Sequence, residues 1–176
     1  QLLKDAKKPL VISGGGVASS NGWNEMREFC SFLNIPVATT VMGIGTSSND
    51  HPNYIGATLG SGAVMKAARE SDLVIALGTR FSFTMGYGKP PVWNSDAKLI
   101  QVDVDPQMIG KNRPVDVGIL GDCKVVVKQL TDLAKEKGLE AVPAEKWLGE
   151  LRNTREDAIK REMRKMSTDR LPTHPF

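Results

Sequence analysis

The chain has 176 residues, 40% of them hydrophobic, which is enough to bury the core of one compact α/β domain with an appendage. Its formal net charge of +3 lies wholly from Lys146 onward, where eight Lys or Arg face five Asp or Glu, while residues 1 to 145 carry fifteen of each. This balance argues against nucleic-acid binding, and the lack of a long apolar run or a signal peptide argues against a membrane protein. We therefore expect a soluble protein.

Six short apolar runs, bounded by Gly, Pro, Asn or Asp, predict β-strands, and amphipathic segments between them predict helices. The predicted strands are 9–13, 36–39, 54–55, 73–77, 99–104 and 118–120. The predicted crossover helices are 23–33, 63–70 and 125–137. In the first helix, one face carries Trp23, Met26, Cys30 and Leu33. Because crossovers between parallel strands are right-handed, this order predicts an α/β fold with a doubly wound parallel sheet.

Beyond Gly138, a natural stop for the third helix, the pattern changes to a linker and then to a charged helix over 145–166. This helix carries an interrupted apolar stripe of Trp147, Leu148, Leu151, Ile159 and Met163. We expect the stripe to pack on a neighbouring domain that is absent from the sequence. The chain starts at Gln1 within a helical run and stops after two prolines, so both ends look cut. The predicted division is a domain over 1–138 followed by a linker and helix over 139–176.

The first predicted strand is followed by a glycine-rich turn, Gly14 to Ser19, just before a helix. Glycines at this place let backbone N–H groups approach a pyrophosphate, as in the dinucleotide-binding fingerprint. The match is imperfect because Ser19 replaces the third glycine. The second strand ends in Thr39 and Thr40, where an NAD-binding fold places Asp or Glu on the ribose, so NAD is disfavoured. The alternative is a turn that serves only tight strand-to-helix packing.

Other polar loops follow the carboxyl ends of the predicted strands, where open α/β sheets bind ligands. Arg80 follows a buried strand and suits a phosphate, and Asp103 ends the fifth strand and suits ribose hydroxyls. The alternatives are a structural ion pair for Arg80 and a turn cap before Pro106 for Asp103. A metal site is disfavoured, because alternation along the strands points neighbouring aspartates apart.

No set of catalytic residues stands out in the sequence. The two cysteines form no CxxC motif and have no histidine partner, so buried packing and a reducing cytoplasm are expected. His51 lies in an Asn-Asp-His-Pro turn, where a loop hydrogen bond is expected rather than proton transfer. We therefore predict no catalytic residue and no metal ligand in this chain.

Several segments jointly resemble the central domain of thiamine-diphosphate (ThDP) enzymes such as acetolactate synthase, oxalyl-CoA decarboxylase, 2-hydroxyacyl-CoA lyase and benzaldehyde lyase. They cover most of residues 8 to 137, in order. The segments are Lys8 to Gly16, Pro36 to Gly45, Asp50 to Pro52, Ser71 to Arg80, Gln101 to Pro106 and Ile109 to Asn112. The resemblance implies a Rossmann-like six-stranded domain between two flanking domains that bind ThDP and Mg²⁺ at a dimer interface.

The same resemblance implies that this chain is non-catalytic by itself. The ThDP signature begins Gly-Asp-Gly and ends in paired Asn, whereas here Gly121 and Asp122 are followed by Cys123. The catalytic glutamate of the family lies in another domain. The parent enzyme is expected to be a homodimer or homotetramer that makes or breaks a carbon–carbon bond next to a carbonyl, using ThDP as the reactive group.

The resemblance also implies a nucleotide in the crevice, either FAD as in acetolactate synthase or ADP as in oxalyl-CoA decarboxylase. The positions that match nucleotide-contacting loops are Gly14, Gly15, Gly16, Thr40, Val41, Leu59, Gly60, Gly78, Thr79, Arg80, Asp103, Val104, Asp122 and Cys123. Two departures affect the flavin half. The stretch Arg80 to Thr84 reads Arg-Phe-Ser-Phe-Thr instead of Arg-Phe-Asp-Asp-Arg, and Leu59 to Gly62 lacks the usual Met-His. These features resemble the acyl-CoA-processing members more closely.

Three other functions stay open at this point. They are a separate nucleotide-dependent oxidoreductase or deacetylase-like protein, a freestanding ADP or FAD sensor, and a structural spacer with an empty crevice. The sequence does not choose among pyruvate, oxalyl-CoA and an aldehyde as the substrate of the parent.

Overall fold

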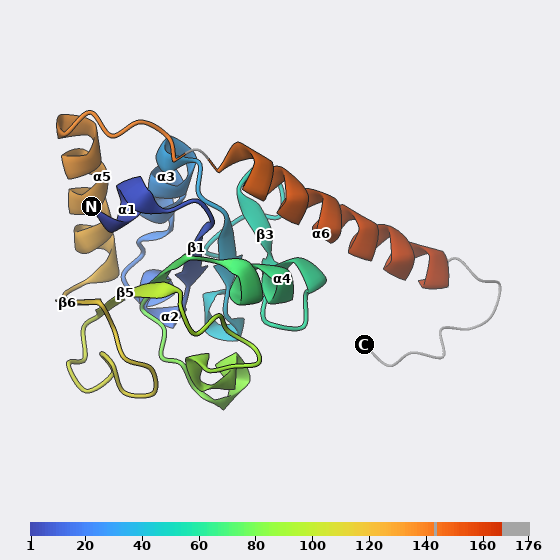
Figure 1. The fold of residues 1–176 in the computed structure, drawn as a ribbon, viewed down its shortest axis with the longest axis horizontal. Helices are drawn as coiled ribbons and strands as arrows, with labels where there is room; N and C mark the ends of the chain where they lie inside the picture. Colours follow the sequence, from blue (N-terminus) through green and yellow to red (C-terminus); the bar gives the residue numbers. More distant parts are fainter. Residues whose placement is uncertain (143, 167–176) are drawn as a thin grey trace.

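A computed structural model describes residues 1–142 and 144–166. Its centre is one six-stranded sheet in which all strands are parallel, in the order β3-β2-β1-β4-β5-β6. The strands are β1 (Pro9–Ser13), β2 (Val37–Thr39), β3 (Tyr54–Ala57), β4 (Leu73–Leu77), β5 (Lys98–Asp103) and β6 (Val117–Leu120). The predicted doubly wound α/β fold is confirmed. The chain runs outward from β1 in one direction and from β4 in the other, so these two central strands form the topological switch point (Figure 1).

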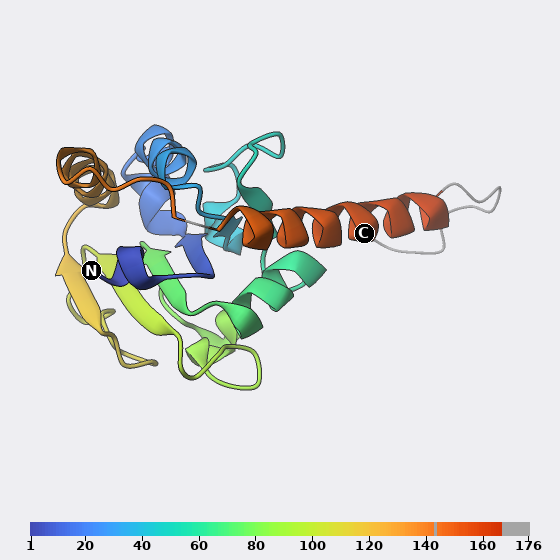
Figure 2. The ribbon, with the colours of Figure 1, turned by 45° about the horizontal axis from the view of Figure 1, so that its top comes forward.

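Helices cover both faces of the sheet. On one face α3 (Trp23–Leu33) packs against α5 (Cys123–Glu136). A second pair of packed helices is α4 (Gly62–Glu70) and α6 (Glu145–Met166) (Figure 2). The remaining short elements are α1 (Leu2–Asp5), α2 (Gly15–Ser19), η1 (Val41–Gly43) and η2 (Phe83–Gly88). The glycine turn predicted over 14–19 is therefore mostly helical, although two glycines in a five-residue helix are unfavourable in isolation. Tertiary packing at the switch point outweighs that preference.

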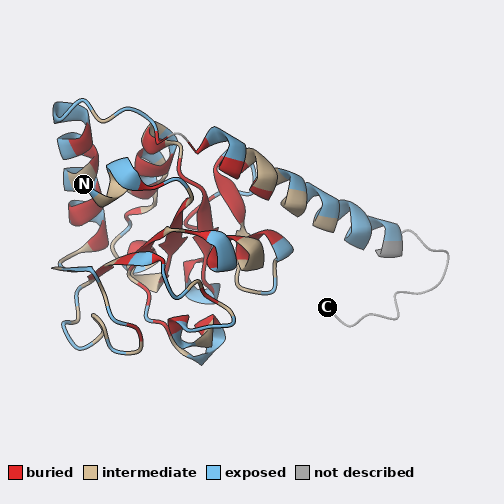
Figure 3. Ribbon diagram, in the orientation of Figure 1, coloured by how far each residue is buried: buried red, intermediate tan, exposed pale blue. Residues whose placement is uncertain are grey.

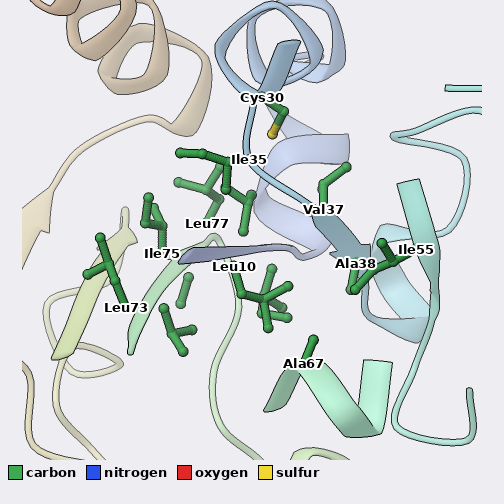
Figure 4. Packing of buried hydrophobic residues seen from close by; sticks show 14 of the residues in the cluster. Leu10, Cys30, Ile35, Val37, Ala38, Ile55, Ala67, Leu73, Ile75 and Leu77 are labelled. Carbon is green, nitrogen blue, oxygen red and sulfur yellow. The ribbon is translucent and has the colours of Figure 1, made fainter. Parts of the chain in front are cut away.

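The central strands are apolar along their whole length because the sheet is covered on both faces. All five residues of β1 and of β4 are buried. In the register of these strands Val11 lies level with Ile75, and Leu10 lies level with Val74. Ile75 points toward the α3 face, while Leu10 points toward Ala67 of α4 (Figure 4). Burial thus follows the continuous apolar runs from which the strands were predicted (Figure 3).

The apolar face of α3 was predicted with one error. Met26, Cys30 and Leu33 are fully buried as expected, but Trp23 is only half-buried. Phe29, which the predicted face omitted, is completely buried because it follows Met26 at i+3 and packs in the same core.

His51 makes local loop contacts, as the sequence predicted. Its Nδ1 accepts a hydrogen bond from the backbone N–H of Asn53 at 3.2 Å, and its Nε2 lies 3.2 Å from the Ser31 hydroxyl. Burial lowers the pKa of His51, and the positive charge of Arg27 lowers it further. The neutral imidazole is therefore the form that fits the folded loop.

The first half of α6 packs on this domain, which corrects the expectation that the whole apolar stripe meets a neighbouring one. Trp147, Leu148 and Leu151 are buried in the same core as the sheet. They are followed by Ile159 and Met163, which are 40% and 63% exposed. The second half of the helix extends away from the domain (Figure 1). The physical reason is length: α4 is nine residues long and the 22-residue α6 continues past it.

Polar contacts fix the packed half of α6 in place. The indole N–H of Trp147 donates to the Pro9 carbonyl at 3.2 Å, at the very start of β1. The ammonium of Lys66 in α4 lies 3.2 Å from the Glu150 carboxylate. The guanidinium of Arg152 donates to the Pro52 carbonyl at 2.6 Å.

We predict that Trp147→Ala lowers the free energy of unfolding by about 3 to 5 kcal/mol, because it opens a cavity in the core and removes the bond to Pro9. The matched control on the same helix, Met163→Ala, should change it by less than about 0.5 kcal/mol. Urea unfolding followed by circular dichroism measures both. Equal effects of the two variants would mean that α6 does not belong to the core of this domain.

Candidate functional site

The turn after β1 and the turn after β4 are in direct backbone contact at the switch point. The N–H of Gly14 donates to the Leu77 carbonyl at 2.9 Å, and the N–H of Gly16 donates to the Gly78 carbonyl at 3.0 Å. Gly78 has a φ of +54°, a left-handed conformation that glycine adopts without strain. These bonds bring the Gly14–Gly16 turn and Arg80 together at the carboxyl end of the sheet.

Close packing accounts for two of the three glycines in the first turn. A Cβ on Gly14 would overlap the Gly78 carbonyl and lie 2.5 Å from Thr79 Cβ, and a Cβ on Gly16 would lie 2.6 Å from Gly78 Cα. The packing interpretation of the turn is therefore correct for these two positions. Gly15 differs, because its Cβ would meet only Met42 Cβ at 3.2 Å. Among the described residues the Gly15 N–H also has no backbone acceptor, so this residue is available to a ligand.

A first cavity of about 410 Å³ opens on the β4–β5 side of this contact. It brings together seven of the site residues predicted from sequence, from the ends of β4 and β5 and from the starts of α2 and α5. These are Gly16, Gly78, Arg80, Asp103, Val104, Asp122 and Cys123. The sequence reasoning missed four further lining residues, Ser19, Ser20, Asp105 and Met108. They flank the predicted stretches, but only the fold shows that they face the same space.

A second cavity of about 460 Å³ opens on the β2 side and shares Gly78 and Arg80 with the first. The other predicted residues that line it are Gly15, Thr40, Val41 and Thr79. Lining residues that were not predicted are Met42, Ser82, Phe83, Thr84 and Met85. Arg80 therefore stands between the two cavities. Three predicted residues line neither: Gly14 is covered by Gly78, and Leu59 and Gly60 follow the edge strand β3.

Arg80 and Asp103 keep hydrogen-bonding capacity for a ligand. Arg80 is exposed, and its guanidinium forms no ion pair within residues 1–142 and 144–166. The structural ion pair considered for it thus finds no partner in the described part of the chain. Asp103 does form the expected turn, because its Oδ1 accepts the Asp105 N–H at 3.0 Å. That bond occupies one carboxylate oxygen and leaves the other for a ligand.

Asp122 and Cys123 at the start of α5 have structural roles that agree with the packing interpretation. Asp122 caps the helix, because its Oδ1 accepts the Val125 N–H at 3.2 Å. Cys123 is 3% exposed, and burial, together with the charges of Asp103 and Asp122, raises the pKa of its thiol to about 12. Burial likewise raises the pKa of Cys30 far above its usual value. Neither cysteine is a thiolate at neutral pH, so neither is a nucleophile there.

The described residues provide neither a cluster of metal ligands nor a membrane-spanning helix. Across 1–142 and 144–166 no three His, Cys, Asp or Glu side chains are grouped so as to hold a metal ion. None of the helices in that part of the chain has the length and apolarity needed to cross a membrane.

The fold and the crevice define this chain as a Rossmann-like α/β domain with two cavities at its switch point that share Gly78 and Arg80. Residues 1–130 match the family described as "Thiamine pyrophosphate enzyme, central domain", and the chain belongs to that family. The resemblance inferred from the sequence is confirmed.

The curated relatives are longer proteins. The chain is 39% identical to an acetolactate synthase of Mycobacterium avium over 140 residues, which is 78% of this chain and 22% of the relative. It is 35% identical to the acetolactate synthase large subunit of Corynebacterium glutamicum over 154 residues, 86% of this chain and 24% of the relative. It is 32% identical to 2-hydroxyacyl-CoA lyase 1 of Mus musculus over 164 residues, 92% of this chain and 27% of the relative. The chain thus spans about a quarter of the length of these relatives.

The glycine contacts predict different outcomes at neighbouring positions. Gly14→Ala should destabilise the fold by about 1 to 3 kcal/mol or more, because the added methyl group overlaps backbone that cannot move. Gly15→Ala should cost less than about 1 kcal/mol, because only a shift of Met42 is needed. Thermal and urea unfolding of both variants measure this difference. Equal destabilisation by both alanines would show that the turn has no position free of packing constraints.

Proposed function

We propose that this chain is the middle domain of a ThDP-dependent enzyme that makes or breaks a carbon–carbon bond next to a carbonyl, and that its own role is to bind a nucleotide and to orient the flanking domains. The observation that carries the proposal is the family match over residues 1–130. The relatives' greater length supports flanking domains in the same subunit. A homodimer or homotetramer, in which ThDP and Mg²⁺ lie between flanking domains, is part of the same proposal.

The residues of this chain do not fit a ThDP or Mg²⁺ site. Gly121, Asp122 and Cys123 lack the third residue of the ThDP signature, and Asp122 is engaged as a helix cap. The described residues also hold no cluster suited to a metal. When bound in the parent enzyme, ThDP supplies an electron sink for reactions next to a carbonyl. We assign none of that chemistry to the side chains described above.

The crevice suits an adenine nucleotide whose phosphates lie at Arg80. The first cavity is lined by three carboxylates, Asp103, Asp105 and Asp122, which favour the hydroxyl and amino donors of a nucleoside and repel phosphate. The second cavity is lined by no carboxylate, and Arg80 is its single charged side chain. A nucleoside in the first cavity and phosphates at Arg80, near the free N–H of Gly15, therefore satisfy the charges best.

The second cavity is where FAD and ADP would differ in their contacts. Both ligands share the adenosine diphosphate half, and a flavin adds a large ring system beyond the phosphates. The second cavity offers hydroxyl groups from Thr40, Ser82 and Thr84 and apolar side chains from Met42 and Phe83, each 75% exposed. The loss of the charged residues typical of acetolactate synthase leads us to propose ADP, or the ADP part of a coenzyme A thioester, as the preferred ligand.

Calorimetric titration of the purified chain with ADP and with FAD tests this proposal. We expect saturable ADP binding that Arg80→Ala weakens about tenfold or more, because a charged hydrogen bond to phosphate is lost. Asp103→Asn should also weaken it, since the amide keeps an oxygen for the bond to Asp105 but replaces the second acceptor oxygen, proposed for the ribose hydroxyls, with an NH2 donor. Lys160→Ala, on the far half of α6, is the matched control and should leave affinity unchanged.

The outcomes separate the alternatives. Tighter binding of FAD than of ADP would assign the domain to a flavin-containing parent. Failure of both ligands to bind to a folded chain would contradict the nucleotide role and favour the structural spacer, which the packing of Gly14 and Gly16 also explains. Circular dichroism checks that each variant is folded.

The parent activity requires the full-length protein. We expect ThDP- and Mg²⁺-dependent turnover, with pyruvate consumption marking an acetolactate synthase type and cleavage of a 2-hydroxyacyl-CoA marking a lyase type. Consumption of neither substrate, with ThDP bound, would contradict both assignments. We also propose a cytoplasmic location, which is supported by two free, buried cysteines, Cys30 and Cys123.

A further inference from the structure

A third cavity, of about 510 Å³, lies away from the nucleotide crevice. Its walls come from the segments that lead into β5 and β6, so it lies toward the amino ends of these strands, whereas the crevice lies at the carboxyl ends of β1, β4 and β5. The charged and polar side chains that line it are Lys89, Ser95, Asp96, Lys98, Asn112, Arg113 and Asp116.

Arg113 is the buried cation of this cavity. The residue is only 7% exposed, and burial lowers the pKa of its guanidinium. Nη1 donates to the Gly88 carbonyl at 3.2 Å, and Nη2 donates to the carbonyls of Asn94 at 3.0 Å and Ala97 at 2.7 Å. A guanidinium has five N–H donors, so two remain for other partners. No carboxylate of the described residues forms an ion pair with it.

The other charges of the cavity offset Arg113 only in part. The charge of Asp116 acts on Arg113 without a direct ion pair, and Asp116 itself lies 2.8 Å from the Lys98 ammonium and accepts the Leu99 N–H at 2.9 Å. Asp96 lies at the exposed rim and accepts a bond from the Ser95 hydroxyl at 3.3 Å. Lys89 is exposed and lines the same cavity. The lining therefore carries three cations and two carboxylates, an excess of one positive charge.

We propose that this cavity binds a small oxyanion, a phosphate or carboxylate group, between Arg113 and Lys89. Buried charges in proteins are normally compensated by a counter-ion, and here the described residues provide carbonyl dipoles but no contacting carboxylate. The planar guanidinium, held in one orientation by three carbonyls, presents its remaining donors to a carboxylate or phosphate. Lys89 adds a second cation at the open side.

The site is independent of the nucleotide crevice. It shares no residue with either crevice cavity. One buried guanidinium and one lysine suffice to bind a single oxyanion. The ligand of this cavity therefore needs no second anionic group that reaches the crevice.

Titration with inorganic phosphate, and separately with malonate, at constant ionic strength tests the proposal. Binding is followed by calorimetry and by the side-chain Nε–H NMR signal of Arg113, assigned with Arg113→Lys. We expect saturable binding that shifts this signal and that Lys89→Glu weakens about tenfold. Lys160→Glu, the same charge change on the exposed half of α6, should have no effect. The tighter of the two anions identifies the phosphate or the carboxylate as the natural group.

Arg80→Ala distinguishes this site from the crevice. Phosphate binding that persists in Arg80→Ala and is lost in Lys89→Glu supports the proposal. Phosphate binding lost only in Arg80→Ala would place the anion in the crevice and overturn it. Absence of saturable binding, or equal weakening by Lys89→Glu and Lys160→Glu, would also overturn it. Lys89 is exposed, so circular dichroism should show that its variant keeps the fold.

Discussion

The structure depends on the close contact between the turn after β1 and the turn after β4. Gly16 donates to the Gly78 carbonyl, and any side chain on Gly14 or Gly16 would overlap Gly78 or Thr79. A similar approach occurs after β2, where a Cβ on Gly43 would overlap the Ser13 carbonyl. The ends of three neighbouring strands can therefore approach one another because glycines stand at the points of closest contact. The crevice is the space left above these turns, and its position follows from this packing.

This packing separates residues that the fold requires from residues that a ligand requires. Glycines at 14 and 16 would be needed in a domain with an empty crevice, so their presence alone says little about binding. Arg80 is different, because it is exposed between two cavities and no ion pair in the described part of the chain holds it. Asp103 serves both the fold and a ligand, since one of its carboxylate oxygens accepts a hydrogen bond within a turn and the other is left for a ligand. Arg80, Asp103 and Gly15 are therefore the residues that favour a nucleotide in the crevice.

The sequence predicted the strands because each contains a short apolar stretch bounded by turn residues. The central strands β1 and β4 are buried along their whole length, as expected for a parallel sheet covered on both faces, whereas the edge strand β6 is mostly exposed. The family resemblance implied seven of the residues around the first cavity, and the parallel sheet brings their loops together at its carboxyl edge. The sequence did not single out Met108, which reaches the first cavity through a turn whose course no periodicity reveals. It also overlooked Arg113, because local sequence does not show that a guanidinium is buried beneath three distant carbonyls.

Helix α6 is linked through β1 to the turns that form the crevice, and this link bears on the proposed orientation of the flanking domains. The sequence pattern assigns α6 to a linker, but Trp147 in this helix is hydrogen-bonded to Pro9, the first residue of β1. The glycine turn follows the last residue of the same strand. Within the central sheet β1 pairs with both β2 and β4, so it cannot shift without disturbing the turns that form the crevice. The exposed Ile159 and Met163 continue the helix beyond this anchor. Under the proposed function, a flanking domain that packs on these two side chains would be held in a fixed orientation to the crevice through one helix and one buried strand.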